Sequence, residues 1–345
     1  RAGGSALEDK DLATSGLLGA AGATDEASTS VGGSRLRDEG VSLCSSSAML
    51  EEDRALMELE DGLRGAARAA LPALRQRAAD LAAGLPAQAV EDAAWFCSDE
   101  TLVRYLATCG NDPERAAAML GGTLAWRAAY FEGADLALAR RADGTRPRSS
   151  LCPCCATDPR QHCAFRVGTD VAGRDVMYTC AGRSANKSGD MGVRHMFLEL
   201  ERLFQAGSGP GQVVVIMDFA GFGLADCNPR TCVLLFSLVK AHYPDRLGQI
   251  VLLGVPSLAA ELVNMVKRLH KDVAQRTVIL KGPLAQQRYM DAYWSCDPPM
   301  LEWMRATLRC KGVPGNYPDL ELSLALRDEC AVEMLKRCAA LQEAS

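Results

Sequence analysis

Residues 243–256 read YPDRLGQIVLLGVP, and the fold is best approached from this stretch. A helix that precedes it must end at Tyr243, because Pro244 disfavours helical geometry in the residue before it. Gly248 permits a tight reversal of the chain. The apolar run Ile250–Gly254 then has the length of a strand that is buried on both faces. The stretch therefore predicts a helix, a turn and a buried strand in direct succession.

Further strands and helices flank this unit on both sides. Apolar runs of strand length occupy Val213–Phe219 and Thr277–Leu280. Between the strands, Asn228 and Pro229 open a helix that runs to about His242, and a second amphipathic helix covers 257–270, with Ser257 as its cap. Strands that alternate with helices need crossover connections, which predicts a largely parallel sheet.

Two shorter β-prone runs precede this alternation. They are Cys163–Val167 and Asp175–Cys180, and the turn between them offers Gly173 for a positive φ. We place the α/β domain that contains all of these runs at residues 146–285.

The remaining sequence divides into a tail, a helical subdomain and an extension. Residues 1–48 are rich in Gly, Ala, Ser and Thr and predict a disordered tail without the apolar segment of a signal peptide. Residues 49–145 predict a helical subdomain, in which Pro72 breaks a helix and Ser98 and Asp112 cap new ones. Residues 286–345 predict a helical C-terminal extension.

The composition narrows the class of protein. The chain has 345 residues, a formal net charge of −5, and 48% hydrophobic residues, which excludes a fibrous chain and a basic nucleic-acid coat. The sequence contains no run of 18 apolar residues, so it predicts no transmembrane helix. The 14 cysteines are scattered, which favours reduced thiols in a cytoplasmic compartment.

Four stretches, in this order, resemble the CRAL-TRIO lipid-binding family. They are Leu102–Leu106 with Asp112–Leu120 and Thr123–Arg127, Thr169–Val176, Val213–Asp218 with Gly221, and 243–248 with Val255-Pro256. The resemblance spans about 95–282 and implies an α/β fold. A helical N-terminal subdomain is followed by a mixed, largely parallel sheet, and helices enclose an apolar cavity.

In the family that the chain resembles, the sheet forms the floor of the cavity and a helix acts as its gate. Helix 257–270 fits the gate, because Leu258, Leu262, Val266 and Leu269 fall on one helical face. The lipid-binding residues implied are Tyr178, Val215, Met217, Leu235, Leu238, Leu252, Leu258, Leu262, Val266 and Leu269. The cations at the end of the gate, Lys267, Arg268 and Lys271, are expected to meet anionic headgroups or a membrane surface.

The resemblance implies a non-enzymatic lipid carrier that is cytoplasmic and peripheral to membranes, with phosphatidylinositol transfer among the family's activities. A hydrocarbon chain of about fifteen CH₂ groups costs on the order of 12 kcal/mol to expose to water, so a carrier needs an apolar cavity that matches the bilayer. We expect a lipid ligand, a transient membrane contact, no nucleic acid, no cofactor and no catalytic residues.

Two other functions fit the sequence less well. A non-transporting CRAL-TRIO module would recruit a protein or membrane partner with a small or closed hydrophobic site. A nucleotide-dependent α/β enzyme would use Gly221-Phe222-Gly223 after a strand, but Asp226 occupies the third glycine position and would repel a pyrophosphate.

The headgroup positions depart from the family's phosphatidylinositol binders. The positions of their basic pair read Cys109-Gly110, and the position of their glutamate in the helix before 243–248 reads Leu234. Lys267 alone matches their gate-helix lysine. A less polar lipid is therefore an alternative to a phosphoinositide.

A cysteine cluster lies between the predicted subdomains. Cys152, Cys154, Cys155, His162 and Cys163 offer possible zinc ligands, but a second well-spaced cysteine pair is missing. We expect free, oxidisable thiols here and no metal.

Overall fold

The structure of the chain is a computed structural model that describes residues 46–85, 94–131, 152, 154–155, 158, 160–206 and 209–310. Most of the predicted tail and the part of the C-terminal extension after residue 310 lie outside the described residues.

Helices make up the described residues before 131. They are α1 (Ser46–Ala67), η1 (Arg68–Ala70), α2 (Leu71–Ala83), η2 (Ala94–Cys97), α4 (Asp99–Thr108) and α5 (Pro113–Tyr130). Pro72 sits in the first turn of α2, where its missing N–H costs no hydrogen bond. Ser98 caps α4 by accepting from the amide of Thr101, and Asp112 caps α5 by accepting from Glu114 and Arg115, as the sequence predicts.

A five-stranded sheet follows, in the spatial order β1-β2-β3-β4-β5. The strands are β1 (Ala164–Thr169), β2 (Asp175–Thr179), β3 (Val213–Asp218), β4 (Leu247–Leu253) and β5 (Thr277–Leu280). β1 and β2 are antiparallel around the turn with Gly173 at φ 75°, and the other neighbours are parallel. The mixed, mostly parallel sheet confirms the predicted fold class.

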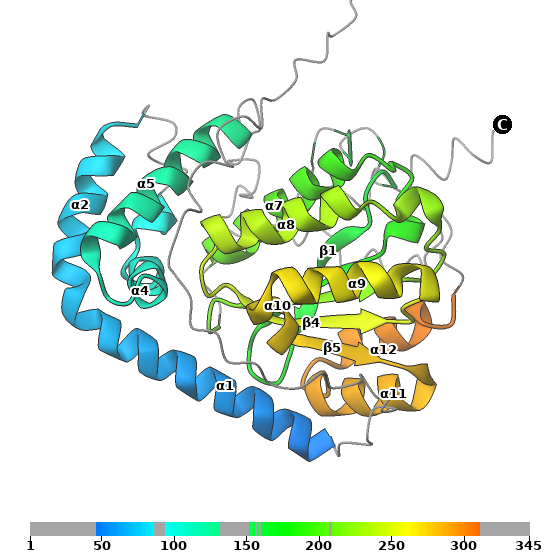
Figure 1. The fold of residues 1–345 in the computed structure, drawn as a ribbon. Helices are drawn as coiled ribbons and strands as arrows, with labels where there is room; N and C mark the ends of the chain where they lie inside the picture. Colours follow the sequence, from blue (N-terminus) through cyan, green and yellow to red (C-terminus); the bar gives the residue numbers. More distant parts are fainter. Residues whose placement is uncertain are drawn as a thin grey trace, which may run out of the picture. The chain divides into compact units, whose positions relative to one another are not determined.

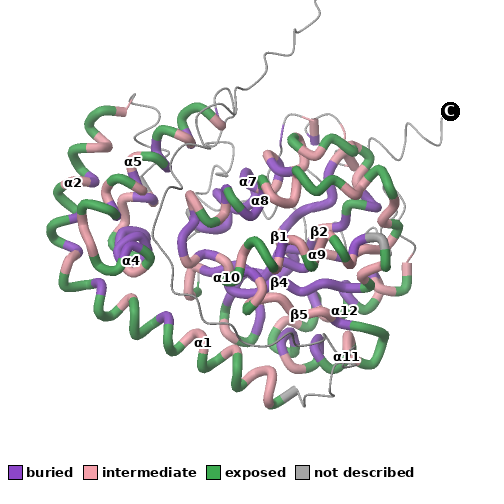
Figure 2. The backbone as a smooth tube through the Cα atoms, in the orientation of Figure 1, coloured by how far each residue is buried: buried purple, intermediate pink, exposed green. Residues whose placement is uncertain are grey.

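Helices cover both faces of this sheet (Figure 1). They are η4 (Ala181–Arg183), α7 (Gly189–Ala206), η5 (Leu224–Asp226), α8 (Pro229–His242), α9 (Ser257–Leu269), α10 (Lys271–Gln275), α11 (Gly282–Tyr293) and α12 (Pro298–Thr307). The strands between them are largely buried (Figure 2). Asn228 caps α8 through its side chain, whereas α9 starts after Pro256 and has no side-chain cap, so the predicted cap by Ser257 is wrong.

Alternation along the strands divides the core into two sides. Val214, Ile216 and Val251 face α11 and α12, where Trp294 and Trp303 are fully buried. Val215 packs on the other side with residues of α7 and α8, and next to it Ile250 and Leu252 pack with Val266 of α9. The second side is the one that holds the cavity described below.

Helix α1 is tied to the α/β region by buried polar contacts. Asp53 accepts two hydrogen bonds from Arg174 at 2.9 and 2.6 Å, and Glu60 accepts one from Gln212 at 2.7 Å. The hydroxyl of Tyr293 on α11 donates to the carbonyl oxygen of Met49 at 2.9 Å. Buried hydrogen bonds therefore hold the helical region against the α/β region.

The turn after α8 differs from its predicted geometry. Asp245, at φ 55°, takes the left-handed conformation, while Gly248 lies inside β4. Gly248 is needed for space, because a Cβ there would come within 2.9 Å of the Arg174 side chain. Arg246 donates to the carbonyl oxygen of Gly211 at 2.9 Å and to the hydroxyl of Thr101 at 2.7 Å.

Among the helices that the structure describes, none has both the length and the apolar character needed to cross a membrane.

Candidate functional site: an apolar cavity between the sheet and helix α9

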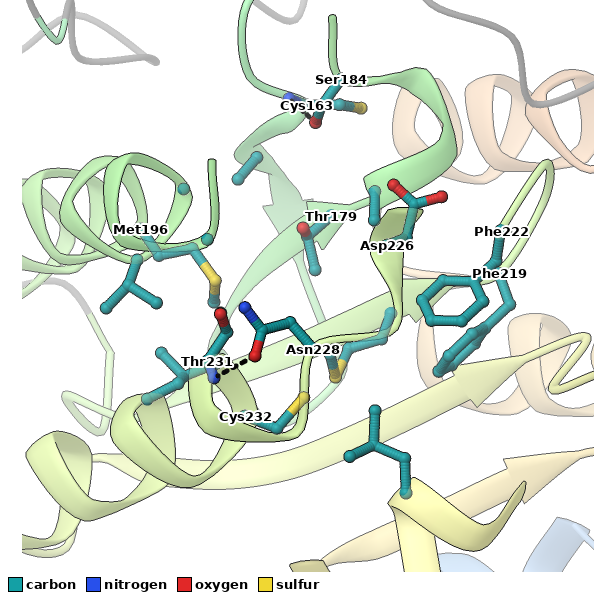
Figure 3. Close-up of a pocket in the computed structure, with 18 of the residues that line it drawn as sticks. Cys163, Thr179, Ser184, Met196, Phe219, Phe222, Asp226, Asn228, Thr231 and Cys232 are labelled. Atoms are coloured by element: carbon teal, nitrogen blue, oxygen red, sulfur yellow. Dashed lines mark hydrogen bonds between the residues drawn. The ribbon is translucent and has the colours of Figure 1, made fainter. Parts of the chain in front are cut away.

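A cavity of about 210 Å³ lies on the side of the sheet that faces α7, α8 and α9. Figure 3 shows a close-up of a pocket with Met196 and Cys232 among the residues that line it, and with Phe219 and Phe222 side by side across the pocket from Met196. The volume has room for on the order of ten water-sized groups, at about 30 Å³ each in the liquid.

The floor of the cavity comes from alternate residues of two parallel strands. Met217 of β3 and Leu252 of β4 are register partners, so their side chains emerge on the same face. Ile250, two residues before Leu252, lies on that face for the same reason. Val214, Ile216 and Val251 have the opposite phase and belong to the other half of the core.

Two helices form the side walls. Helix α8 contributes Leu235 and Phe236, while α7 contributes Val193 and Met196. The helices approach closely near Gly189, where a Cβ would come within 2.0 Å of the Thr231 hydroxyl oxygen. By contrast, a Cβ on Gly192 would meet nothing within 4 Å, so this residue leaves open space at the cavity wall.

Helix α9 covers the floor. Leu262, Val263, Val266 and Lys267 line the cavity from this helix, and Val266 packs with Ile250 and Leu252. The chain enters α9 through Gly254, whose φ of 63° suits a residue without a Cβ. An apolar helix face over an apolar floor explains why the space between them is apolar.

One end of the cavity is polar. Lys187 donates to the carboxylate of Asp226 at 2.9 Å and to the carbonyl oxygen of Ala181 at 2.8 Å. Ser184, Asn186 and Asn228 also line the cavity. Leu224, next to this end, has 80% of its surface exposed. The cavity therefore combines apolar walls with a charged and hydrogen-bonding rim.

A second, smaller cavity continues in the direction of Tyr243. It measures about 30 Å³ and shares Met196, Met217, Leu235, Phe236 and Ile250 with the main cavity. Methionine side chains are unbranched and adapt their shape easily. Movement of Met196 and Met217 would join the two spaces into one elongated apolar channel.

The Cys232 thiol, which lines the cavity, is suited to packing. Burial raises the pKa of the Cys232 thiol to about 11, which keeps it neutral and unreactive at neutral pH. Asp218, at the end of β3, is engaged by the Tyr178 hydroxyl at 2.6 Å and by the Ala220 amide at 2.9 Å.

In the glycine-rich turn after β3, a backbone amide is hydrogen-bonded to a side chain of the same turn. The Gly223 amide donates to the carboxylate of Asp226 at 2.9 Å. A carboxylate therefore occupies the place where a dinucleotide-binding turn receives a phosphate, which argues against the nucleotide-dependent alternative.

The segment that builds this cavity matches one protein family. The match to the CRAL/TRIO domain covers residues 160–291, from the turn before β1 to α11. Residues 160–291 form a CRAL/TRIO domain. Among solved structures, that of Sfh5 is similar, with 13% sequence identity, a TM-score of 0.42, and coverage of 64% of this chain and 79% of that one. No curated protein matches the chain.

Within the CRAL/TRIO domain, most of the predicted lipid-binding residues gather at one place. Met217, Leu235, Leu252, Leu262 and Val266 line the main cavity, and Val215 lines the smaller one.

Leu238 is buried in the core that includes α5 and α7 and lines neither cavity. Leu258 lies in α9, but its side chain is outside the described ones.

Two predicted lipid-binding residues lie elsewhere. Tyr178 pairs with Ile216 in the parallel register and faces α12, on the opposite side of the sheet. Leu269 is the last residue of α9 and has 58% of its surface exposed. The placement of both residues in the cavity is therefore corrected.

Of the predicted headgroup contacts, Lys267 lines the cavity of the CRAL/TRIO domain, while Arg268 and Lys271 are exposed. Several lining residues escaped prediction, namely Phe219, Phe222, Phe236, Ile250, Val263, Val193 and Met196. Ile250 could have been found, since strand alternation puts it on the face of Leu252. The phenylalanines after β3 follow no periodic pattern.

Proposed function

We propose that this chain binds one hydrophobic molecule in the cavity between β3, β4 and α9 and presents it at a membrane surface. CRAL/TRIO membership suggests a lipid-binding or transfer role. The single observation that supports the proposal most is the apolar lining by Met217, Leu252, Leu262 and Val266, of which Leu252 and Val266 are buried members of one hydrophobic cluster.

The size of the cavity limits the ligand class. Room for on the order of ten water-sized groups suits one short acyl chain, an isoprenoid or a compact ring system. A phospholipid with two chains of about fifteen CH₂ groups each needs several times that space. A two-chain lipid therefore requires α9 to move away from the floor.

Helix α9 is suited to such a movement. It is preceded by Gly254 and Pro256 and followed by the break at His270 before α10. Arg268 and Lys271 are exposed at this end, and an anionic membrane attracts each nearby cation by about 1 kcal/mol. We infer that membrane contact at this end favours the open cavity.

The small volume also supports a second candidate, a CRAL/TRIO module that senses a lipid without transferring it. Such a module would load ligand and keep it. A carrier would exchange it between vesicles, because an apolar cavity that matches the bilayer makes the exchange nearly thermoneutral.

Two variants on one helix test the proposal. Leu262→Asp places a carboxylate in the apolar cavity, while Leu269→Asp places the same group on the exposed end of α9. We expect Leu262→Asp to lose loading of a fluorescent fatty acid by at least tenfold, since an unpaired buried carboxylate is strongly disfavoured. Leu269→Asp should load normally. Equal loading of both variants would contradict the proposal.

Vesicle transfer distinguishes the two candidates. Transfer of a labelled single-chain lipid between donor and acceptor vesicles supports a carrier. Stable loading without transfer supports a sensing module.

A further inference from the structure

A cluster of sulfur and nitrogen atoms lies beside the CRAL/TRIO cavity. The Sγ atoms of Cys152, Cys154 and Cys155 and a ring nitrogen of His162 all lie within 4.8 Å of one another. Cys152, Cys155 and His162 are at most 4% exposed, and Cys154 is partly buried. Four soft or borderline donors thus converge on one point in the interior.

The separations have the scale of a metal tetrahedron. The Nδ1 atom of His162 lies 3.3 Å from the sulfur of Cys152, 3.5 Å from that of Cys154 and 3.4 Å from that of Cys155. Zn–S bonds of about 2.3 Å and Zn–N bonds of about 2.0 Å put sulfur and nitrogen about 3.5 Å apart in a tetrahedron. The sulfurs of Cys152 and Cys154 are closer together than in such a site, at 3.1 Å.

The three thiols compete for one hydrogen-bond acceptor, the Nδ1 atom of His162. Nδ1 of a neutral imidazole can make one good hydrogen bond, yet three thiols lie within 3.5 Å of it. Without a metal ion, three thiols crowd around one imidazole nitrogen. A single cation at the centre would be coordinated by all four side chains.

We propose that Cys152, Cys154, Cys155 and His162 bind one Zn²⁺ ion. Three cysteines and one histidine in a closed tetrahedron are typical of a structural zinc site rather than a catalytic one, which keeps a ligand position open. Binding converts the three thiols to thiolates and releases their protons. The spatial convergence of the four ligand atoms is the reason to propose a metal ion here, where the cysteine spacing alone favours free thiols.

The position of the site suggests what the ion stabilises. His162 lies two residues before the start of β1, and both it and His195 of α7 line the main cavity. The Nδ1 atom of His195 lies 3.8 Å from Cys155 Sγ, and its Nε2 donates to the carbonyl oxygen of Ala164 at 2.8 Å. A zinc ion would therefore fix the segment of Cys152–Cys155 against β1 and α7 and support this wall of the cavity.

Elemental analysis of the full chain, purified without a metal-affinity column, tests the proposal. We expect about one zinc equivalent per chain. Cobalt exchanged into the site should give the visible bands of tetrahedral Co²⁺ together with a thiolate-to-cobalt charge-transfer band. Removal of the metal by a chelator should lower Tm by more than about 5 °C.

Three variants localise the metal. Cys154→Ser and His162→Gln should each lose most of the bound zinc, and Cys154→Ser is the milder change because that side chain is only partly buried. Cys296→Ser, at an exposed cysteine between α11 and α12, should keep it.

Several results would overturn the zinc site. One is a folded, metal-free wild-type chain without a cobalt charge-transfer band, and another is a mass 2 Da lower, which would reveal a disulfide within the cluster. A different metal at the same stoichiometry would also overturn it. So would full zinc content in both Cys154→Ser and His162→Gln. Because the deciding readouts are metal content and the cobalt spectrum, they do not depend on lipid binding.

Discussion

Arg104 on α4 donates hydrogen bonds to both the backbone oxygen and the carboxylate of Asp245, at 2.5 and 2.8 Å. Arg64 on α1 pairs with the same carboxylate. The three side chains are at most 13% exposed. The residue that takes the left-handed turn before β4 thus also anchors two helices of the N-terminal region to the CRAL/TRIO domain.

Asp245→Ala should lower the free energy of unfolding by about 3 kcal/mol, because the buried Arg104 and the partly buried Arg64 lose the carboxylate that they share. Urea unfolding measures the effect. Asp245→Asn serves as the control for backbone strain, since asparagine tolerates a positive φ and removes only the charge. A loss below about 0.5 kcal/mol in both variants, the usual range for surface changes, would contradict this role for Asp245.

Gly192→Leu should abolish ligand loading without loss of stability. The new side chain would extend into the open space beside the cavity, and leucine favours a helix over glycine by about 0.8 kcal/mol. Fluorescent fatty-acid loading and thermal unfolding are the measurements. Gly122→Leu, at an exposed and equally uncrowded position of α5, gains the same helix propensity and should load normally.

Stability should depend on pH through His242. Its ring stacks on Trp126 at 4.0 Å, and burial lowers its pKa to about 4. Since the unfolded chain binds the proton near pH 6.5, this contribution is fully present above pH 6.5 and is lost as the pH falls towards 4. The loss should be about 2 kcal/mol after discounting for the partial exposure of the ring.

Urea unfolding between pH 4 and pH 7 measures this slope. His242→Gln should flatten the profile, since it removes the titrating ring. A profile of unchanged steepness in this variant would assign the effect to other groups.

Leu224→Asp should slow lipid transfer from anionic vesicles while ligand loading in solution stays normal. Leu224 is exposed beside the polar end of the cavity, where a membrane-contacting carrier would insert an apolar side chain. Leu284→Asp, at a 60% exposed leucine of α11, is the matched control and should transfer at the wild-type rate. Equal rates for the two variants would exclude Leu224 from the membrane contact and leave it at the cationic end of α9.

The strands and helices of the CRAL/TRIO domain follow from local sequence. Thr277–Leu280 and the cap at Asn228 are found where their patterns place them. Which face a strand residue takes depends on register, however. Met217 and Leu252 were both expected in the cavity and are register partners, whereas Tyr178, also expected there, pairs with Ile216 and faces the other way.

Helix α9 shows a related limit of prediction from sequence. The spacing of Leu262, Val266 and Leu269 puts them on one face, but burial also requires something to pack against. The helix ends at Leu269, so this side chain extends to solvent. The left-handed Asp245 was not predictable either, because Gly248 was the residue whose chemistry favoured that conformation.

Among these features, the convergence of the cysteine cluster on His162 was the hardest to predict, because it depends on tertiary structure. Zinc sites are recognised in sequences by two well-spaced pairs of ligands, and this chain has closely spaced cysteines, a histidine seven residues later and no second cysteine pair. Only the folded chain brings His162 to within 3.5 Å of all three sulfurs.

Native mass spectrometry of the full chain, purified from its expression host, tests most directly whether the cavity holds a ligand. We predict one hydrophobic molecule per wild-type chain, released on denaturation and identified in the organic extract, and none bound to Gly192→Leu. A folded wild-type chain that carries no hydrophobic molecule, and takes up none when incubated with single-chain lipids, would contradict the proposed function.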